Sequence, residues 1–199
     1  MSVYSVFYKV FSRPVHWLFR IYVIQPPRFP EGGFILCANH TSNADVLVLS
    51  QVCGGRQIRY MAKKELFSIP LVHGLITALG AYPINRQGAD VTAIKKTIEL
   101  LHAGEIVGIF PQGTRQAGKN PAETPVRGGV GMIALKAQVP IVPVFLKTEG
   151  HRTRFFCRTD VYFGEPIYPD SLPSGSGKEV YQQVAEQIFG EVCKLGAGE

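Results

Sequence analysis

The sequence is poor in cysteine and has no hydrophobic run long enough to cross a bilayer. Its four cysteines, among 199 residues, show no Cys-x-x-Cys pair and no histidine at metal-ligand spacing. This excludes a disulfide-stapled scaffold and gives no sign of a metal site. No segment approaches the ~18–20 apolar residues of a spanning helix, and the start lacks a secretory-signal pattern. We expect an uncleaved, non-spanning chain in a reducing compartment.

Acidic residues are also in the minority. The chain has 21 Lys and Arg against 15 Asp and Glu, which gives a formal net charge of +6. Such an excess predicts an anionic partner. With 46% hydrophobic and 18% charged residues, the composition is that of a globular protein and not of a disordered one. The length fits one domain.

Residues 1–30 contain no acidic residue, but they do contain Lys9, Arg13, Arg20 and Arg28. We predict two helices here, over residues 2–12 and from Pro14 onward, because polar side chains recur every three or four positions among apolar and aromatic ones. Two interpretations remain open. The helices pack on the domain with a solvated stripe, or they form an amphipathic anchor in the plane of an anionic membrane surface. The exclusively positive polar residues favour the anchor.

After Pro26-Pro27, short apolar runs alternate with helical patterns. Strands are predicted at Gly33–Ala38, Gln57–Met61, Ala81–Asn85, Ile106–Phe110, Ile141–Leu146 and Arg154–Phe163. Helices are predicted at Asp45–Cys53, Phe67–Leu79 with a break at Pro70, Ala89–Ala103, Gly129–Gln138 and a final stretch from Tyr181 to Leu195. This alternation predicts an α/β fold, a single domain over residues 31–199 with a largely parallel or mixed central sheet flanked by helices. Residues 1–30 are predicted to form an amphipathic helical anchor before it.

Polar residues gather where the predicted strands end, which is the edge at which α/β proteins place their sites. The first cluster follows Gly33–Ala38 and contains Asn39, His40 and Asp45. His40 and Asp45 meet only if the chain turns between them, and the intervening Thr, Ser and Asn are turn and helix-cap residues. A carboxylate bonded to one imidazole nitrogen leaves the other as a general base for a hydroxyl. An N-capped helix with a coincidental histidine remains the alternative.

Two further clusters bring basic residues to the same edge. Ile84-Asn85-Arg86 ends one predicted strand, and the run from Phe110 through Gln112, Gly113 and Thr114 to Arg115 ends another. The following loop adds Lys119 and Arg127 before a glycine-rich helix start at residues 128–131. Basic side chains and backbone N–H donors at a helix start hold phosphate. A solvated basic loop is the alternative, but three polar clusters at one sheet edge favour an anion-binding site.

Together these blocks resemble the motifs of the glycerolipid (lysophosphatidate-type) acyltransferase family. The matching blocks, in chain order, are Asn39-His40 with Asp45, Gly80 with Ile84-Asn85-Arg86, residues 110–115, and residues 139–144 with their two prolines. The resemblance covers roughly residues 34–167. It departs from the family pattern at Gln112, where that pattern has Glu.

The resemblance implies transfer of a fatty acyl group from acyl-CoA or acyl-carrier protein to the sn-2 hydroxyl of lysophosphatidate, which gives phosphatidate. It implies that His40, oriented by Asp45, is the general base. The residues implied to bind the acceptor phosphate are Arg86, Gly113, Thr114 and Arg115, with Asn39, Gln112, Lys119 and Arg127 in support. No metal and no cofactor are expected beyond the acyl thioester.

The expected partners are the two substrates, an anionic membrane surface and, for one type of donor, acyl-carrier protein. A peripheral position on the cytoplasmic face of a membrane is therefore expected. Nucleic acid is not expected as a partner, because the basic excess accompanies an apolar segment without aromatic–basic interleaving. Two alternatives stay open. One is an acyltransferase for glycerol 3-phosphate or another lysolipid, and the other is a membrane-surface lipid-binding protein made catalytically weak by Gln112.

Overall fold

A computed structural model describes residues 3–85 and 90–197 of the chain. Seven strands form one sheet in the order β1-β7-β6-β2-β5-β3-β4. The strands are β1 (Ile21–Gln25), β2 (Phe34–Ala38), β3 (Ile58–Lys63), β4 (Ala81–Ile84), β5 (Ile106–Ile109), β6 (Ile141–Thr148) and β7 (Thr159–Phe163). Only β6 and β7 run antiparallel, and the other neighbours are parallel. The predicted α/β fold with a largely parallel or mixed central sheet is confirmed.

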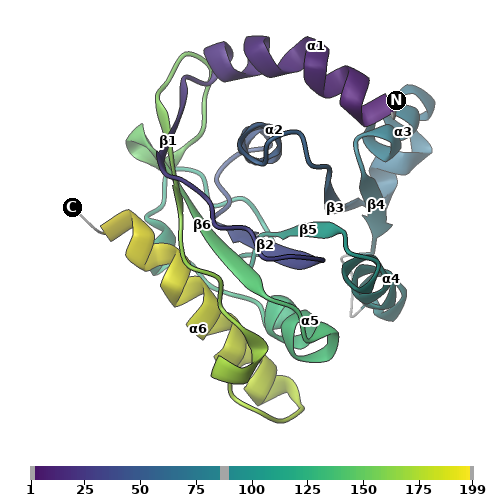
Figure 1. The fold of residues 1–199 in the computed structure, drawn as a ribbon, viewed down its shortest axis with the longest axis vertical. Helices are drawn as coiled ribbons and strands as arrows, with labels where there is room; N and C mark the ends of the chain where they lie inside the picture. Colours follow the sequence, from purple (N-terminus) through teal and green to yellow (C-terminus); the bar gives the residue numbers. More distant parts are fainter. Residues whose placement is uncertain (1–2, 86–89, 198–199) are drawn as a thin grey trace.

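Helices cover both faces of this sheet. They are α1 (Val3–Leu18), α2 (Ala44–Val52), α3 (Pro70–Ala78), α4 (Val91–His102), α5 (Gly129–Ala137) and α6 (Lys178–Ala197), with short turns η1 (Lys64–Ser68), η2 (Pro121–Glu123), η3 (Glu149–His151) and η4 (Pro169–Ser171). Figure 1 shows α1 and α2 on one side of the sheet and α5 and α6 on the other. None of the helices in the described part of the chain combines the length and hydrophobicity that crossing a bilayer requires.

Strand β2 lies at the centre of the sheet and contributes to two separate cores. Its five residues are all fully buried. Ile35 and Cys37 pack toward α5 and α6, whereas Phe34, Leu36 and Ala38 pack toward the α1 and α2 side. A continuous apolar run whose alternate residues face opposite ways is what a central parallel strand requires.

The prediction of two N-terminal helices is wrong, because a single helix, α1, runs through Pro14. Proline removes only one backbone hydrogen bond, the one to the carbonyl of Val10. Pro14 and Val10 are both exposed, so water can hydrogen-bond to the Val10 carbonyl in place of the missing N–H.

The residues after α1 form a strand where the sequence pattern predicts more helix. β1 pairs in parallel with β7 at the edge of the sheet. The β-branched and aromatic residues of Ile21-Tyr22-Val23-Ile24 favour a strand, and Pro26-Pro27 follow it. Residues 21–25 therefore belong to the central sheet.

The predicted strand Arg154–Phe163 is also too long, since only its second half, β7, is extended. Residues 152–158 form a loop between η3 and β7. Within it Phe156 has a φ of +61°, outside the extended region. Its N–H donates to the carbonyl of Leu18 at 2.6 Å, so the loop is tied to the end of α1.

Candidate active site

Asn39 fixes the point at which the chain leaves the sheet. Its buried amide donates from Nδ2 to the carbonyl of Leu146 at 3.1 Å and accepts from the Leu146 N–H at 2.8 Å. The side chain thus continues, like a further peptide group, the hydrogen bonding between β2 and β6. The next residue, His40, is placed at the carboxyl-terminal edge of β2.

His40 and Asp45 are brought together by the turn that the sequence spacing requires. His40 Nδ1 lies 2.9 Å from Asp45 Oδ2, and the exposed fraction of the side chain is 14% for His40 and zero for Asp45. Because an ionised carboxylate only accepts hydrogen bonds, Nδ1 carries the proton in the neutral ring. The other ring nitrogen, Nε2, then has a free lone pair, which is the state a general base needs.

The Asp45 carboxylate is held by five donors. Besides His40, Oδ2 accepts the backbone N–H groups of Thr41 at 2.6 Å and Ser42 at 2.8 Å. Oδ1 accepts the hydroxyl of Thr153 at 2.6 Å and that of Thr41 at 3.4 Å. With donors on both oxygens the carboxylate has a single orientation, and it fixes the imidazole in turn.

Stacked aromatic rings pack against the face of the His40 imidazole. The His40 and Phe110 rings have centroids 4.0 Å apart and an interplanar angle of 16°. Tyr60 lies next in the stack, with its centroid 6.2 Å from that of Phe110. Gly108 makes room for it, because a Cβ at this position would collide with the Tyr60 ring. The imidazole is therefore restricted in both translation and rotation.

Gln112 is buried, and its side chain connects the backbone of His40 to the loop that contains Thr124. We call this connection the Gln112 brace. Its Oε1 accepts the backbone N–H of His40 at 2.6 Å, and its Nε2 donates to Thr124 Oγ1 at 2.7 Å. The Thr124 hydroxyl in turn donates to the carbonyl of Pro121 at 2.6 Å. Since the His40 N–H is a donor, the amide orientation is fixed. The neutral amide is used on both sides, as an acceptor toward the dyad and as a donor toward the loop.

The expected phosphate ligands lie in the loop that Gln112 braces. Arg115 is exposed, and its Nη1 donates to Asn43 Oδ1 at 3.1 Å, next to the dyad turn. Gly113 has a left-handed backbone (φ +69°). Because it has no side chain, the Arg127 side chain can pass close to it, whereas a Cβ would lie 2.7 Å from Arg127 Cδ. Thr114 is exposed between Gly113 and Arg115.

Lys119, expected in a supporting role, is not brought into this arrangement. Lys119 is exposed farther along the loop, where its N–H donates to the carbonyl of Gln116 at 3.3 Å. Arg86 lies outside the described residues. The residue before it, Asn85, is fixed by its N–H, which donates to Asp90 Oδ2 at 2.7 Å.

Sequence reasoning missed Thr153, which lies 108 positions from Asp45. The hydroxyl is buried, and its backbone N–H also donates to Thr41 Oγ1 at 3.2 Å. A single threonine in an irregular loop carries no periodicity or spacing signal. Only the fold shows that the loop after β6 supports the dyad.

An open groove of about 590 Å³ adjoins the dyad. It is lined by Phe19, Ser42, Asn43, Ala44, Leu47, Arg152, Thr153, Arg154 and Phe155. Ser42 and Thr153 both bond to Asp45, so the groove begins at the turn that joins His40 to Asp45. Its apolar wall and two arginines suit a ligand with a hydrocarbon part and an anionic part. Within the described residues, no group of three or more His, Cys, Asp or Glu side chains is placed to hold a metal ion.

Comparison with known proteins identifies the class. A family model described as "Acyltransferase" matches residues 20–147. The chain is 31% identical over 167 residues to the 1-acyl-sn-glycerol-3-phosphate acyltransferase of Bacillus subtilis, covering 83% of this chain and 82% of that one. It is 33% identical over 170 residues to the enzyme of that name from Streptococcus pneumoniae, covering 83% of this chain and 61% of that one.

A solved structure extends the similarity to the whole fold. The crystal structure of the 1-acyl-sn-glycerophosphate acyltransferase PlsC from Thermotoga maritima superposes with a TM-score of 0.73 at 27% identity. The match covers 98% of this chain and 80% of that one. The chain therefore belongs to the acyltransferase family, among the 1-acyl-sn-glycerol-3-phosphate acyltransferases.

Proposed function

We propose that this protein transfers a fatty acyl group from an acyl thioester to the sn-2 hydroxyl of lysophosphatidate, which gives phosphatidate. Family membership and the activity for which its relatives are named support the substrate class. The observation that carries the proposal is the His40–Asp45 hydrogen bond of 2.9 Å at the carboxyl edge of β2. It leaves Nε2 unprotonated, and the turn that holds Asp45 borders a groove that suits an amphipathic anion.

His40 acts as general base in the proposed reaction. Nε2 takes the proton of the sn-2 hydroxyl, and the oxygen attacks the thioester carbonyl. The tetrahedral intermediate then collapses, the C–S bond breaks, and the departing sulfur takes the proton back from Nε2. Asp45 stabilises the imidazolium that exists between these two transfers. A positioned general base of this kind contributes about 10²–10⁴-fold in rate.

The loop that follows β5 holds the acceptor phosphate in this proposal. Arg115 and Thr114 are exposed there, and Gly113 presents its backbone beside Arg127. Arginine suits this role because its planar fork forms two parallel hydrogen bonds to phosphate oxygens. Arg86 is assigned the same role by its place in the family motif, and Lys119 adds positive charge farther along the loop.

The acyl donor is acyl-CoA or acyl-carrier protein, and no further cofactor is needed. Both carriers are thiols esterified to the acyl group, so the same attack serves either one. Holding donor and acceptor together in one site supplies a large part of the rate.

We also propose that the protein works as a peripheral protein on the cytoplasmic face of a membrane. The outward side of α1 supports this, because Val6, Val10 and Phe11 are exposed there together with Lys9 and Arg13. Exposed apolar side chains interspersed with cations are typical of helices that lie in a lipid interface.

The test is an acyl-transfer assay with radiolabelled oleoyl-CoA and lysophosphatidate, alongside glycerol 3-phosphate and other lysolipids. His40→Ala is expected to abolish product formation, and Asp45→Asn to lower kcat at least ~10²-fold without unfolding. Asn fits because the Thr41 and Thr153 hydroxyls can turn to accept from its amide nitrogen. A wild-type protein that binds lysophosphatidate without turnover would instead be a lipid-binding module, and a preference for another acceptor would change the substrate.

A further inference from the structure

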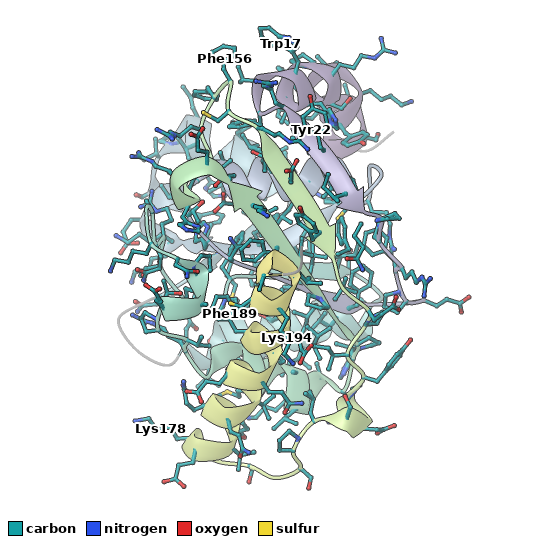
Figure 2. All side chains as sticks on the ribbon, turned by 90° about the vertical axis from the view of Figure 1, so that its left-hand side faces the viewer. Trp17, Tyr22, Phe156, Lys178, Phe189 and Lys194 are labelled. Carbon is teal, nitrogen blue, oxygen red and sulfur yellow. The ribbon has the colours of Figure 1, made fainter. Side chains whose placement is uncertain are left out.

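Three aromatic side chains lie exposed together beside the groove. Trp17 at the end of α1 is 70% exposed, and Phe155 and Phe156 in the loop of residues 152–158 are each 60% exposed. The Trp17 and Phe156 rings meet edge to face with centroids 5.5 Å apart. Phe155 packs at 5.0 Å on the buried ring of Phe19. Figure 2 shows Trp17 and Phe156 at one extremity of the molecule, far from Lys178.

The backbone of this loop holds Phe156 outward at a conformational cost. A φ of +61° is rare for any residue with a side chain and is an outlier for a bulky aromatic one. The hydrogen bond from its N–H to the carbonyl of Leu18 keeps it there. Strained backbone of this kind persists where it has a function. Here it presents an apolar ring to the outside.

Unpaired positive charge surrounds the aromatic rings. Arg20, Arg152 and Arg154 are exposed, and none of them forms an ion pair within the described residues. Arg158 is different, because it pairs with Asp160 at 2.7 Å and lies over the Tyr22 ring. Aromatic rings next to free arginines match the two layers of a membrane interface, the acyl boundary and the anionic head groups.

The same loop forms part of the groove wall. Arg152, Arg154 and Phe155 line the groove, and between them the buried Thr153 donates to Asp45 at 2.6 Å. Trp17 and Phe156 line a separate hollow with Arg20. Since Phe156 follows Phe155, a surface that contacts all three rings lies next to the groove.

We propose that Trp17 and the loop of residues 152–158 form a second membrane-docking element, which seats the groove mouth against an anionic bilayer. The inference rests on the proposed function in one respect, that the acceptor is a membrane lipid which enters the groove from that side. A bilayer fits better than a protein partner, since the positive charge is unpaired and the surface continues the exposed face of α1.

Vesicle sedimentation tests this with the full-length chain and bilayers of phosphatidylcholine with one quarter phosphatidylglycerol. The variant Trp17→Ser/Phe156→Asn is expected to bind at least ~10-fold more weakly, because two interfacial aromatic rings are lost. Tyr168→Ser is the matched control. Tyr168 is 54% exposed beside η4, at the other end of β7, and its replacement is expected to leave vesicle binding unchanged.

Phe156→Asn alone separates docking from folding. Asparagine adopts left-handed backbone more readily than phenylalanine, so the melting temperature is expected to stay equal or rise while vesicle binding falls. Equal vesicle binding by the single variant, the double variant and wild type would overturn the proposal, even if the loop then proved to bind another protein.

The charge component is tested separately. Arg152→Gln/Arg154→Gln is expected to lose most of the extra binding that phosphatidylglycerol confers, whereas Lys178→Gln at the far end of the molecule keeps it. A dependence on phosphatidylglycerol that survives in the double arginine variant would contradict the head-group contact.

Turnover distinguishes this proposal from the proposed function. With short-chain lysophosphatidate and acyl-CoA, both monomeric in water, Trp17→Ser/Phe156→Asn is expected to match wild type. On vesicle-borne substrate it is expected to be slower. If wild type has no turnover on any acceptor, the proposed function fails, and the vesicle-binding comparison still decides the docking element.

Discussion

Gln112, which stands where the family motif has Glu, forms hydrogen bonds to its neighbours with both ends of its amide. The carboxylate of the family pattern is replaced by an amide whose oxygen faces the His40 N–H and whose nitrogen faces Thr124. Among the described residues, its side chain bonds to His40 and Thr124 and to no arginine. Its contact with the proposed dyad is therefore made through the backbone of His40.

Substitutions of Gln112 are expected to rank by how many of these two hydrogen bonds they keep. Gln112→Leu leaves the half-buried His40 N–H without its acceptor. This costs about 1–3 kcal/mol of stability and loosens the dyad. Gln112→Glu keeps that acceptor and requires the Thr124 hydroxyl to turn away from the Pro121 carbonyl. The melting temperature and kcat should therefore both decrease in the order Gln, Glu, Leu at position 112. A Leu variant as active as wild type would show that the brace is dispensable.

The residues of the dyad were within reach of sequence reasoning, but their supports were not. His40 and Asp45 stand five apart in a turn-rich block, so a short-range pattern indicates that they meet. Thr153 and the Phe110–Tyr60 stack depend on how distant strands are ordered in the sheet. No local periodicity encodes that order.

At the scale of elements, Asp90 joins a strand end to a helix start. Its carboxylate accepts the Asn85 N–H at the end of β4 and the Ala93 N–H in the first turn of α4. These two bonds, the Asn85 bond first, lower the pKa of the Asp90 carboxyl below its usual value. Asn85 is thereby attached to the residue that caps α4.

The contribution of Asp90 to stability is expected to depend on pH. Because its pKa is lowered by folding, the stabilisation is present above the unfolded-state pKa of about 4 and is lost as pH falls through the folded-state value. Asp90→Asn should therefore melt below wild type at pH 7. The difference should shrink in melts at progressively lower pH below about 4. A difference that stays constant with pH would mean that the charge is not involved.

The buried strands matched the predictions, and so did the exposed helix α3, whereas the predictions failed at α1, at β1 and in the loop of residues 152–158. The central strands are continuous apolar runs, such as Phe34–Ala38. A parallel strand covered on both faces is hydrophobic along its length, so the sequence pattern predicts it directly. β1 exposes four of its five residues at the sheet edge, so its pattern was mistaken for a helical one. The loop of residues 152–158 has strand-like aromatic residues that the left-handed Phe156 backbone takes out of the sheet.

At the scale of the whole molecule, the charge of the chain is distributed unevenly. The outward side of α1 carries Lys9 and Arg13, and residues 1–30 have no acidic residue to offset them. Electrostatic attraction to anionic lipid contributes roughly 1 kcal/mol per basic residue near the surface. The net charge of +6 is therefore concentrated partly where the proposed membrane contact begins.

Charge reversal on α1 is expected to weaken vesicle binding without unfolding the protein. Lys9→Glu/Arg13→Glu should reduce binding to vesicles with one quarter phosphatidylglycerol by at least ~10-fold and have little effect on neutral vesicles. Circular dichroism checks that the fold is retained. Lys178→Gln/Lys194→Gln, on α6 across the sheet, is the control. Equal sedimentation of the α1 variant and the control would remove α1 from the contact.

The burial of Phe19 and Ile21 has a mechanical consequence. Both side chains are buried in the core beneath α1 and α2, at the junction between the end of α1 and the start of β1. These side chains join the base of α1 to the same core as β2, the strand that leads into His40. In the proposed reaction, a membrane that holds α1 would therefore also set the angle at which His40 Nε2 faces an incoming alcohol.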